Sequence, residues 1–561
     1  GLTALEVADA RTFFQPDAGL FTPEVVRAWS DARMRRGAAE LTEALRAQGH
    51  AEARVKVAET RLDRTSGTVE LRIEVEEGPV WRVTEAIVRV EGTELDVPEV
   101  ELALVGETWV RTRSLDAGQG LRRRYQTLGF PDVRVEWDAV PAGLTESGER
   151  EVKVTARVET GPRVRVGEVG FTGAVRTRPE LLERRARKLR PGDWFDPAEV
   201  EAARLRLARL GVFRRVETRE DDVPGTDRRA VVFELREEAP WEAAWMLGYG
   251  SYEQARVGLE VARNNLWGLA HRTRFEAVQS LKGTRADYRY TVPTFFDDTV
   301  EATGRVFGLR REEQSFDRVE YGASVEARRE VPWIRAVGTG GFTYEVLRAE
   351  DVELGTTASE VDDATVASVD LGLSRDKRDN PILPRAGWRW GIQSQFALPE
   401  LGSEVRYERL EMALAWHRAL GDERWMHVGV YQGLLFSGDE EVPLNKLFFP
   451  GGESSIRGYQ QGEATQRDAD GRFVGVRSSW LVNLELEQLV TGRWTAVVFV
   501  DTLGTAVDTN EWPGDETLVS AGLGVRYQSP IGPLRLEYGR NLNPRPGDAS
   551  GTLHFSIGFP F

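Results

Sequence analysis

The sequence predicts a two-part fold: α+β N-terminal repeats of three β-α-α-β-β units, followed by a sixteen-stranded antiparallel transmembrane β-barrel. Three observations predict it. The first 238 residues mix helical and strand periods and repeat themselves. From Ala239 onward the helical period ends, and short segments alternate apolar with polar residues. No run of about eighteen apolar residues occurs, so we expect no transmembrane helix.

Composition narrows the class of protein further. The net charge of −16 argues against nucleic acid as a partner and against a basic membrane footprint. There is no cysteine, which excludes a disulfide framework and a thiol nucleophile. The chain starts at Gly1 without an apolar signal core, which fits a mature exported protein or a trimmed chain.

The N-terminal repeats are clearest in the third unit, residues 162–238. It reads as a strand, the helix PELLERRARKL, the helix PAEVEAARLRLARLG ended by Gly211, and two strands. Residues 81–161 repeat this order, with helices expected at PEVELALVGETWV and SLDAGQGLRRRYQTLGF. Residues 1–80 hold a third copy whose start is irregular or truncated. Small α+β repeats are usually interaction modules, whose edge strands can accept another chain.

The C-terminal part, residues 239–561, contains sixteen strand-like segments bounded by turn signals. We expect strands near 240–253, 254–265, 270–282, 285–295, 299–314, 318–331, 334–350, 364–375, 387–398, 404–419, 424–437, 477–490, 493–507, 518–529, 532–543 and 551–561.

The alternation within these strands favours a membrane barrel over a soluble sandwich. Leu534, Leu536 and Tyr538 point one way, and Arg535 and Glu537 point the other. A membrane barrel places the apolar face in lipid and the polar face in the lumen. The even strand number and the terminal aromatic residue fit this interpretation.

Turn lengths supply an independent test of the strand count. If the repeats lie in the periplasm, connections after even-numbered strands face inward, and most of these are short, for example FFDD, ALGDE and VTG. Several connections after odd-numbered strands are longer, and the longest is the loop 439–476 after strand eleven.

That longest loop contains FFPGGESSIRGYQ, residues 448–460, a compact mixture of aromatic, glycine and charged residues. Gly451, Gly452 and Gly458 allow the backbone to fold back on itself. Arg457 carries a positive charge that arginine does not lose at any ordinary pH. Ile456 precedes it, and Tyr459 follows two positions later. An ordinary hairpin loop is the alternative interpretation.

With these motifs the chain resembles the BamA/TamA superfamily, in which POTRA domains (β-α-α-β-β modules) precede a sixteen-stranded outer-membrane barrel. The resemblance spans nearly the whole chain and is carried by FFPGGESSIRGY, VVFVDTLG, SRDKRDNPILPRAGW, LVNLELEQLVTGRW and VRYQSPIGPLRLEYG. Three modules together with GG-x-x-SIRGY are most similar to the TamA branch. One departure is the extra residue before the glycine of FVDTLG, which leaves the register beyond Asp501 open, and the start of the first module also matches poorly.

The resemblance implies that the loop 439–476 folds into the barrel and that Arg457 meets acidic residues on the lumen wall. Glu485 and Asp501 occupy the matching positions, and Glu487 and Glu537 are weaker candidates. Physical reasoning agrees, because an unpaired buried guanidinium would cost several kcal/mol and its planar fork suits a carboxylate. Ordinary, unpaired lumen charges are the alternative.

Backbone N–H and carbonyl groups cannot stay unpaired in lipid, so every strand edge in the membrane must be paired. This requirement predicts a lateral seam at which the first and last strands of the barrel pair. A weakly paired seam could open and offer its edge to a client strand. Pro560 lacks an N–H and would weaken the pairing. Simple chain termination explains the same residues equally well. The candidate seam residues on the last strand are Gly551, Phe555, Gly558, Pro560 and Phe561.

These observations lead us to expect a non-enzymatic assembly factor that inserts β-barrel or autotransporter-type clients into the outer membrane, with its POTRA modules in the periplasm. No G-x-S-x-G, P-loop or H-E-x-x-H motif occurs, and we expect no cofactor and no metal. The expected partners are outer-membrane lipids, unfolded outer-membrane proteins and, by resemblance, a TamB-like periplasm-spanning protein. A two-partner-secretion-type transporter exporting one substrate through the lumen is the main alternative, and a passive porin is a third.

Overall fold

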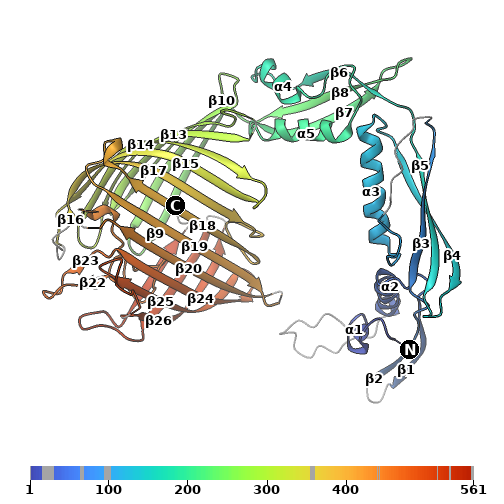
Figure 1. Ribbon diagram of the computed structural model, residues 1–561. Coiled ribbons are helices and arrows are strands. Elements are labelled where there is room, and N and C mark those ends of the chain that lie inside the picture. The colour runs from blue at the N-terminus through green and yellow to red at the C-terminus, as the bar shows by residue number, and fades with distance from the viewer. Residues whose placement is uncertain are drawn as a thin grey trace. The chain divides into compact units, whose positions relative to one another are not determined.

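The computed structural model describes residues 2–14, 31–63, 68–93, 103–297, 299–353, 360–421, 423–438, 440, 442–514, 516–529 and 532–557 (Figure 1). The chain divides into two compact units. One comprises Gly1–Gly173, Leu182–Leu207 and Arg215–Leu235, and the other comprises Ala174–Leu181, Ala208–Arg214 and Arg236–Phe561. Among the described residues, no helix has both the length and the apolar character needed to span a membrane.

The N-terminal repeats form three small sheets with helices. The first sheet is the antiparallel pair β1–β2, the second has the order β3-β5-β4, and the third has the order β6-β8-β7. In the second and third sheets the first and last strands of the repeat pair in parallel. The elements are α1 (Val7–Thr12), α2 (Asp31–Ala47), β1 (Arg54–Asp63), β2 (Thr68–Glu76), β3 (Trp81–Glu91), α3 (Arg111–Thr127), β4 (Arg134–Leu144), β5 (Arg150–Glu159), β6 (Arg165–Thr172), α4 (Pro179–Ala186), α5 (Pro197–Ala208), β7 (Phe213–Asp222) and β8 (Arg228–Glu237).

One expected helix is wrong over its described part. Residues 103–110, the second half of PEVELALVGETWV, form turns and extended chain. The reason is pairing with the start of β3, because the Val83 N–H donates to the Glu107 carbonyl and the Trp109 N–H donates to that of Trp81. Gly106 also has a φ of 83°, which ends any helix there. The first half of this segment lies outside the described residues. So does the start of the helix that PEVVRAWSDARMRRGAAELTEALRAQG predicts in the first repeat unit.

The C-terminal part is a closed barrel of sixteen strands with antiparallel neighbours, which confirms the predicted fold class. Each of the sixteen predicted segments overlaps one barrel strand, and the described ends differ by at most about three residues. The strands are β9 (Trp241–Gly250), β10 (Gln254–Leu266), β11 (His271–Ser280), β12 (Gly283–Val292), β13 (Val300–Glu312), β14 (Asp317–Val331), β15 (Ala336–Glu350), β17 (Asp363–Asp376), β18 (Gly387–Ala397), β19 (Tyr407–Ala419), β20 (Arg424–Phe436), β24 (Ser478–Thr491), β25 (Trp494–Ala506), β26 (Leu518–Ser529), β27 (Gly532–Asn541) and β28 (Gly551–Ile557).

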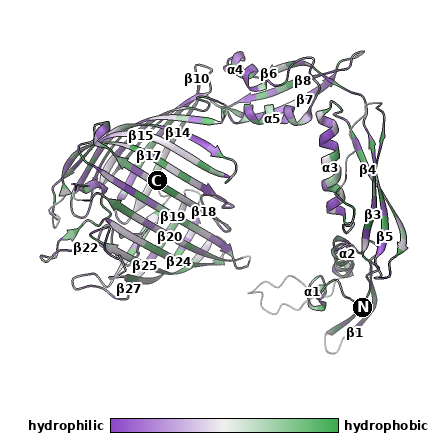
Figure 2. Ribbon diagram, in the orientation of Figure 1, coloured by the Kyte–Doolittle hydropathy of each residue, from purple (hydrophilic) through white to green (hydrophobic). Residues whose placement is uncertain are grey.

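The two faces of the barrel wall differ in the way the alternation predicts. Leu484, Val498 and Leu523 are about half exposed or more on the outer face, at 48%, 53% and 64%. On the inner face, by contrast, Asp501 of β25 is completely buried and Glu537 of β27 is 5% exposed. Green and purple residues alternate along the strands in Figure 2. The outer surface is therefore apolar, as lipid contact requires.

The longest connection, between β20 and β24, packs against the inner wall. It contains β21 (Val442–Pro443), η2 (Leu444–Lys446), β22 (Gln466–Arg467) and β23 (Phe473–Val474), and β21 pairs in parallel with β16 (Glu360–Val361) of another loop. Val442 and Leu444 are fully buried in a cluster that includes Leu347 of the wall. Lys446 donates to Glu345 over 2.6 Å. These contacts hold one end of the loop inside the barrel.

Candidate functional site: a buried arginine in the barrel lumen

The centre of the inward-folded loop is Arg457, whose side chain is 6% exposed. Its guanidinium makes a two-pronged contact with Asp501 of β25, with Nε donating to Oδ2 over 2.9 Å and Nη2 donating to Oδ1 over 2.8 Å. The backbone N–H of Arg457 donates to the same carboxylate over 3.0 Å. Paired charge-assisted hydrogen bonds of this kind fix orientation as well as distance.

Two further carboxylates complete the surroundings of Arg457. Nη1 donates to Glu485 of β24 over 2.7 Å and to Glu537 of β27 over 3.2 Å. The guanidinium carbon lies 3.5 Å from the centre of the Phe499 ring, a cation–π contact. Burial lowers the pKa of Arg457, but the hydrogen bond to Asp501 and the three nearby carboxylates raise it above its ordinary value, so the group stays charged.

The glycines of the motif allow this close approach. A Cβ on Gly458 would lie 1.7 Å from Asn541 Oδ1, and a Cβ on Gly539 of the wall would lie 2.3 Å from the Arg457 carbonyl oxygen. Gly451 and Gly452 have φ values of 131° and 95°, which favour glycine, and the Gly452 N–H donates to the Tyr459 carbonyl over 3.1 Å. The loop backbone therefore folds back on itself and presses against β27.

The remaining motif residues anchor the loop on both sides of Arg457. Ile456 is fully buried with Tyr459 in an apolar cluster that includes Leu503 of β25. The Tyr459 hydroxyl donates to Asp548 over 3.0 Å. Ile456, Arg457 and Tyr459 were selected from one motif in the sequence, and in the structure all three contact the lumen wall.

Arg526 of β26 is a central residue that the sequence reasoning missed. Its Nη1 donates to Glu485 over 2.7 Å and its Nε donates to Glu537 over 2.7 Å, so it shares two carboxylates with Arg457. It also contacts Glu487 over 3.2 Å. A signal was present, because Leu523 and Val525 face outward at 64% and 42% exposure, and the alternation then turns Arg526 inward.

Of the carboxylates, Glu537 contacts Arg457 directly although the sequence ranked it as a weaker candidate, whereas Glu487 contacts Arg526 instead of Arg457. The register question after Asp501 is also answered. Asp501 pairs with Asn483 and Gly504 pairs with Trp480, and the register between β24 and β25 does not shift from Asp501 to Ala506. A Cβ on Gly504 would lie 1.9 Å from the Pro513 carbonyl oxygen, so the glycine accommodates the loop that crosses it.

The seam between β28 and β9 closes the barrel through few described residues. Ser556 pairs with Gly250 and Ile557 pairs with Tyr249, whereas β9 pairs with β10 along its whole length. Ser251 adds two hydrogen bonds to the Phe555 backbone, with its Oγ donating to the carbonyl over 3.1 Å and accepting from the N–H over 2.6 Å.

Among the other seam candidates, Gly551 pairs with Arg540 of β27, and a Cβ there would lie 2.4 Å from the Gly539 carbonyl oxygen. Gly558, Pro560 and Phe561 lie outside the described residues. The loop also contacts β28, because His554 Nε2 donates to the Arg457 carbonyl over 3.0 Å and the Thr552 hydroxyl donates to that of Gly458 over 2.9 Å. Arg457 and the carboxylates that it contacts form a cluster that we call the arginine clamp. This clamp is therefore adjacent to the seam.

Comparison with known proteins decides the family. The model of the Omp85 superfamily domain matches residues 265–561, and a POTRA model, described as a surface antigen variable number repeat, matches residues 164–238. The chain belongs to the Omp85 superfamily. This confirms the resemblance to the BamA/TamA superfamily, and the greater similarity to the TamA branch stays a prediction. As in that superfamily, the barrel lies in the outer membrane and the POTRA region lies in the periplasm.

The chain is similar to curated proteins named outer membrane protein assembly factor BamA. That of Neisseria meningitidis serogroup B is 22% identical over 90% of this chain and 69% of its own length. That of Nitratidesulfovibrio vulgaris is 25% identical over 73% of this chain and 53% of its own length, so the chain spans only about half of that Omp85 relative.

Two solved structures show a similar fold. BamA from Haemophilus ducreyi lacking POTRA domains 1–3 superimposes with a TM-score of 0.64 at 20% identity, covering 85% of this chain and 99% of that one. CdiB from Acinetobacter baumannii has a TM-score of 0.52 at 13% identity, covering 86% and 90%.

Proposed function

We propose that this protein assembles β-barrel or autotransporter-type clients into the outer membrane by opening the seam between β28 and β9. Superfamily membership and the similarity to proteins named BamA support the assembly role. The observation that supports the mechanism is the pairing of β28. All of its described residues, Gly551–Ile557, pair with β27, whereas of these only Ser556 and Ile557 pair with β9.

The mechanism follows from the cost of unpaired backbone groups in lipid. On its seam side, the described pairing of β9 involves only Tyr249 and Gly250, at one end of the strand. A client strand that pairs with this edge would satisfy its own N–H and carbonyl groups while it enters the membrane. Trp245 and Leu247 of β9 are 74% and 71% exposed, and they would meet lipid or client on the outer face.

Within this proposal, Arg457 holds the inward-folded loop against β25 and β27, next to the seam. The clamp fixes the barrel wall on one side of the opening, so that separation occurs between β28 and β9. Its loss is expected to leave a folded barrel with impaired assembly activity.

A disulfide across the seam tests the proposal, and the chain has no cysteine of its own to interfere. Cysteines replace Gly250 and Ser556, which are register partners. The matched control is Ala286→Cys with Gly308→Cys, a small-residue pair between β12 and β13. Oxidation of the seam pair should block client insertion in proteoliposomes, and reduction should restore it. Undiminished insertion with the seam locked would refute seam opening.

A second candidate function is export of a dedicated polypeptide through the lumen, as in two-partner secretion. The observation that favours it is a polar lumen cavity of about 1110 Å³, lined by charged residues that include Arg305, Glu326 and Arg409. Single-channel conductance measured alongside client assembly separates the two functions. An exporter would translocate its substrate with the seam locked, whereas an insertase would not act on its clients.

We also propose that the POTRA region recruits the periplasmic partner, for which the resemblance suggests a TamB-like protein. The sheet orders leave β4 and β7 at edges, where a strand of another chain can add. Photo-crosslinkers placed on β4 and β7 should capture that partner in the native membrane. Capture at helix α3 instead would contradict recruitment through the sheet edges.

A further inference from the structure

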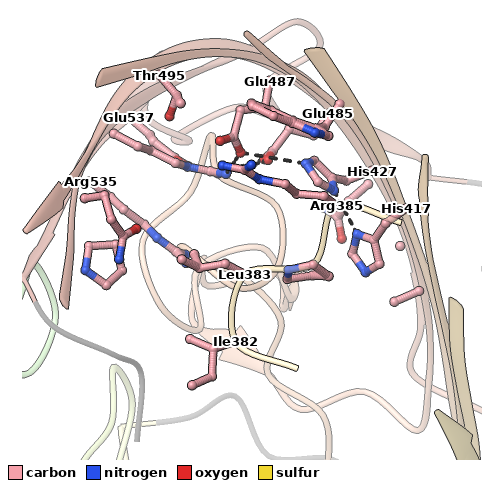
Figure 3. A pocket seen from close by; sticks show the side chains of 18 of the residues that line it. Ile382, Leu383, Arg385, His417, His427, Glu485, Glu487, Thr495, Arg535 and Glu537 are labelled. Carbon is pink, nitrogen blue, oxygen red and sulfur yellow. Dashed lines mark hydrogen bonds and ion pairs between the residues drawn. The ribbon is translucent and has the colours of Figure 1, made fainter. Parts of the chain in front are cut away.

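The lumen wall next to the arginine clamp carries two histidines that the proposed function does not use. His417 of β19 and His427 of β20 are register partners, and their Nδ1 atoms lie 2.7 Å apart. They line a cavity of about 520 Å³ together with Glu485 and Glu487 (Figure 3). Figure 3 shows the His427 ring directed toward the two glutamates.

We propose that His427, Glu485 and Glu487 bind a transition-metal dication of the Zn²⁺ class. One ligand atom from each residue lies within 4.8 Å of the others. Around a tetrahedral zinc ion the ligand atoms are about 3.4 Å apart, given metal–ligand distances of about 2.1 Å. Side-chain adjustments of about 1 Å would therefore close the site. One imidazole with two carboxylates is a donor set suited to zinc, and the cavity leaves room for a water as the fourth ligand.

The histidine pair has the hydrogen bond that a metal-binding imidazole needs. When His427 Nε2 holds the metal, its Nδ1 must carry the proton and donate, and His417 Nδ1 accepts it. His427 Nε2 makes no hydrogen bond within the described part of the chain, although it lies 3.7 Å from Glu487 Oε2. The lone pair of this buried nitrogen is thus available for a metal, and His417 acts as a positioning residue.

The carboxylates at the site are shared with arginines. Arg457 and Arg526 contact four carboxylates: Glu485, Glu487, Asp501 and Glu537. Because Arg385, Arg493 and Arg535 line the same cavity, the support for a metal comes from the donor set and not from an excess of negative charge. Each carboxylate has two oxygens with several lone pairs, so Glu485 and Glu487 can serve Arg526 and a metal together. The side chains of His427 and Glu487 are 17% and 20% exposed, which leaves them accessible from the cavity.

The test uses the full chain in detergent micelles, freed of metal by a chelator and titrated with ZnCl₂ by calorimetry. We expect one site, unaffected by excess Mg²⁺ because magnesium prefers oxygen ligands. Glu487→Gln and His427→Ala should each weaken Zn²⁺ binding at least about 100-fold. His417→Gln should weaken it by about 10- to 100-fold, the usual effect of losing a hydrogen bond to a ligand. His50→Ala, which removes a histidine of the POTRA region, should leave binding unchanged.

A rescue variant distinguishes ligation from structural damage. His427→Cys replaces imidazole by a thiolate, which also binds zinc, so Zn²⁺ binding should persist, and Co²⁺ should give the thiolate-to-metal absorption band that the parent chain lacks. Heat-modified gel mobility checks that each variant barrel is folded. Absence of Zn²⁺ binding to the parent chain, or equal binding by folded His427→Ala or Glu487→Gln, would overturn the proposal.

Discussion

The substitution Arg457→Ala is the sharpest test of the clamp, because the structure shows what it would leave behind. Glu485 and Glu537 would keep Arg526 as a partner. Asp501 is completely buried. Among the residues that the structure describes, it would lose its one guanidinium partner and keep hydrogen bonds from the Asn483 side chain and the residue 457 N–H. Removing one partner of a buried ion pair costs about 3–5 kcal/mol.

We expect this cost to appear first as release of the loop, because the sixteen-stranded ladder does not depend on Arg457 for its hydrogen bonds. The barrel should stay folded, the loop 439–476 should become sensitive to protease, and complementation of a strain lacking the protein should fail. Arg457→Lys keeps the charge but loses the two-pronged contact, so it should show an intermediate effect.

A double-mutant cycle separates the ion pair from general damage to the loop. Asp501→Asn removes the buried charge that Arg457 compensates. The double variant should therefore lose less stability than the sum of the single variants, with a coupling energy of about 1–3 kcal/mol by urea unfolding. Additive losses, or full complementation by Arg457→Ala, would refute the reasoning.

Three further predictions follow from other contacts. Gly458→Ala should release the loop as Arg457→Ala does, because its Cβ would lie 1.7 Å from Asn541 Oδ1, whereas Gly304→Ala, with no atom within 4 Å, should be neutral in the same protease assay. Arg526→Ala should lower the urea midpoint of the barrel by more than Arg424→Ala, because Arg526 serves three lumen carboxylates; equal midpoints would contradict a central role. Burial raises the pKa of Glu237, but hydrogen bonds from Thr177 and Arg176 outweigh burial and hold this pKa below 4.5. The ionised Glu237 carboxylate therefore stabilises the fold fully above pH 4.5, and this stabilisation is lost as the pH falls through the lowered pKa. Protection factors at residues 174–181, which correct for the intrinsic pH dependence of exchange, should therefore fall in acid in the parent chain and should be low at every pH in Glu237→Gln; protection in the parent chain that does not change with pH would contradict this assignment.

The barrel strands, and the face of each strand that meets lipid, could be predicted from the sequence alone. A two-residue period is a local property, so Leu534, Leu536 and Tyr538 can be separated from Arg535 and Glu537 without knowing any partner strand. The pairing of Arg457 with carboxylates was also foreseeable, because a buried guanidinium requires them. The helix expected over 98–110 is wrong in its described part because that choice depended on pairing with β3, which the local pattern does not contain.

Contacts between lumen side chains of different strands could be found from the tertiary structure alone. Arg526 lies forty-one residues from Glu485 in the chain, and the pairing of β25 with both β24 and β26 brings the two into contact. His417 and His427 looked scattered in the sequence, yet the register of β19 on β20 makes them direct partners. Register is set by the summed pairing of whole strands, so it fixes distances that no short stretch of residues encodes.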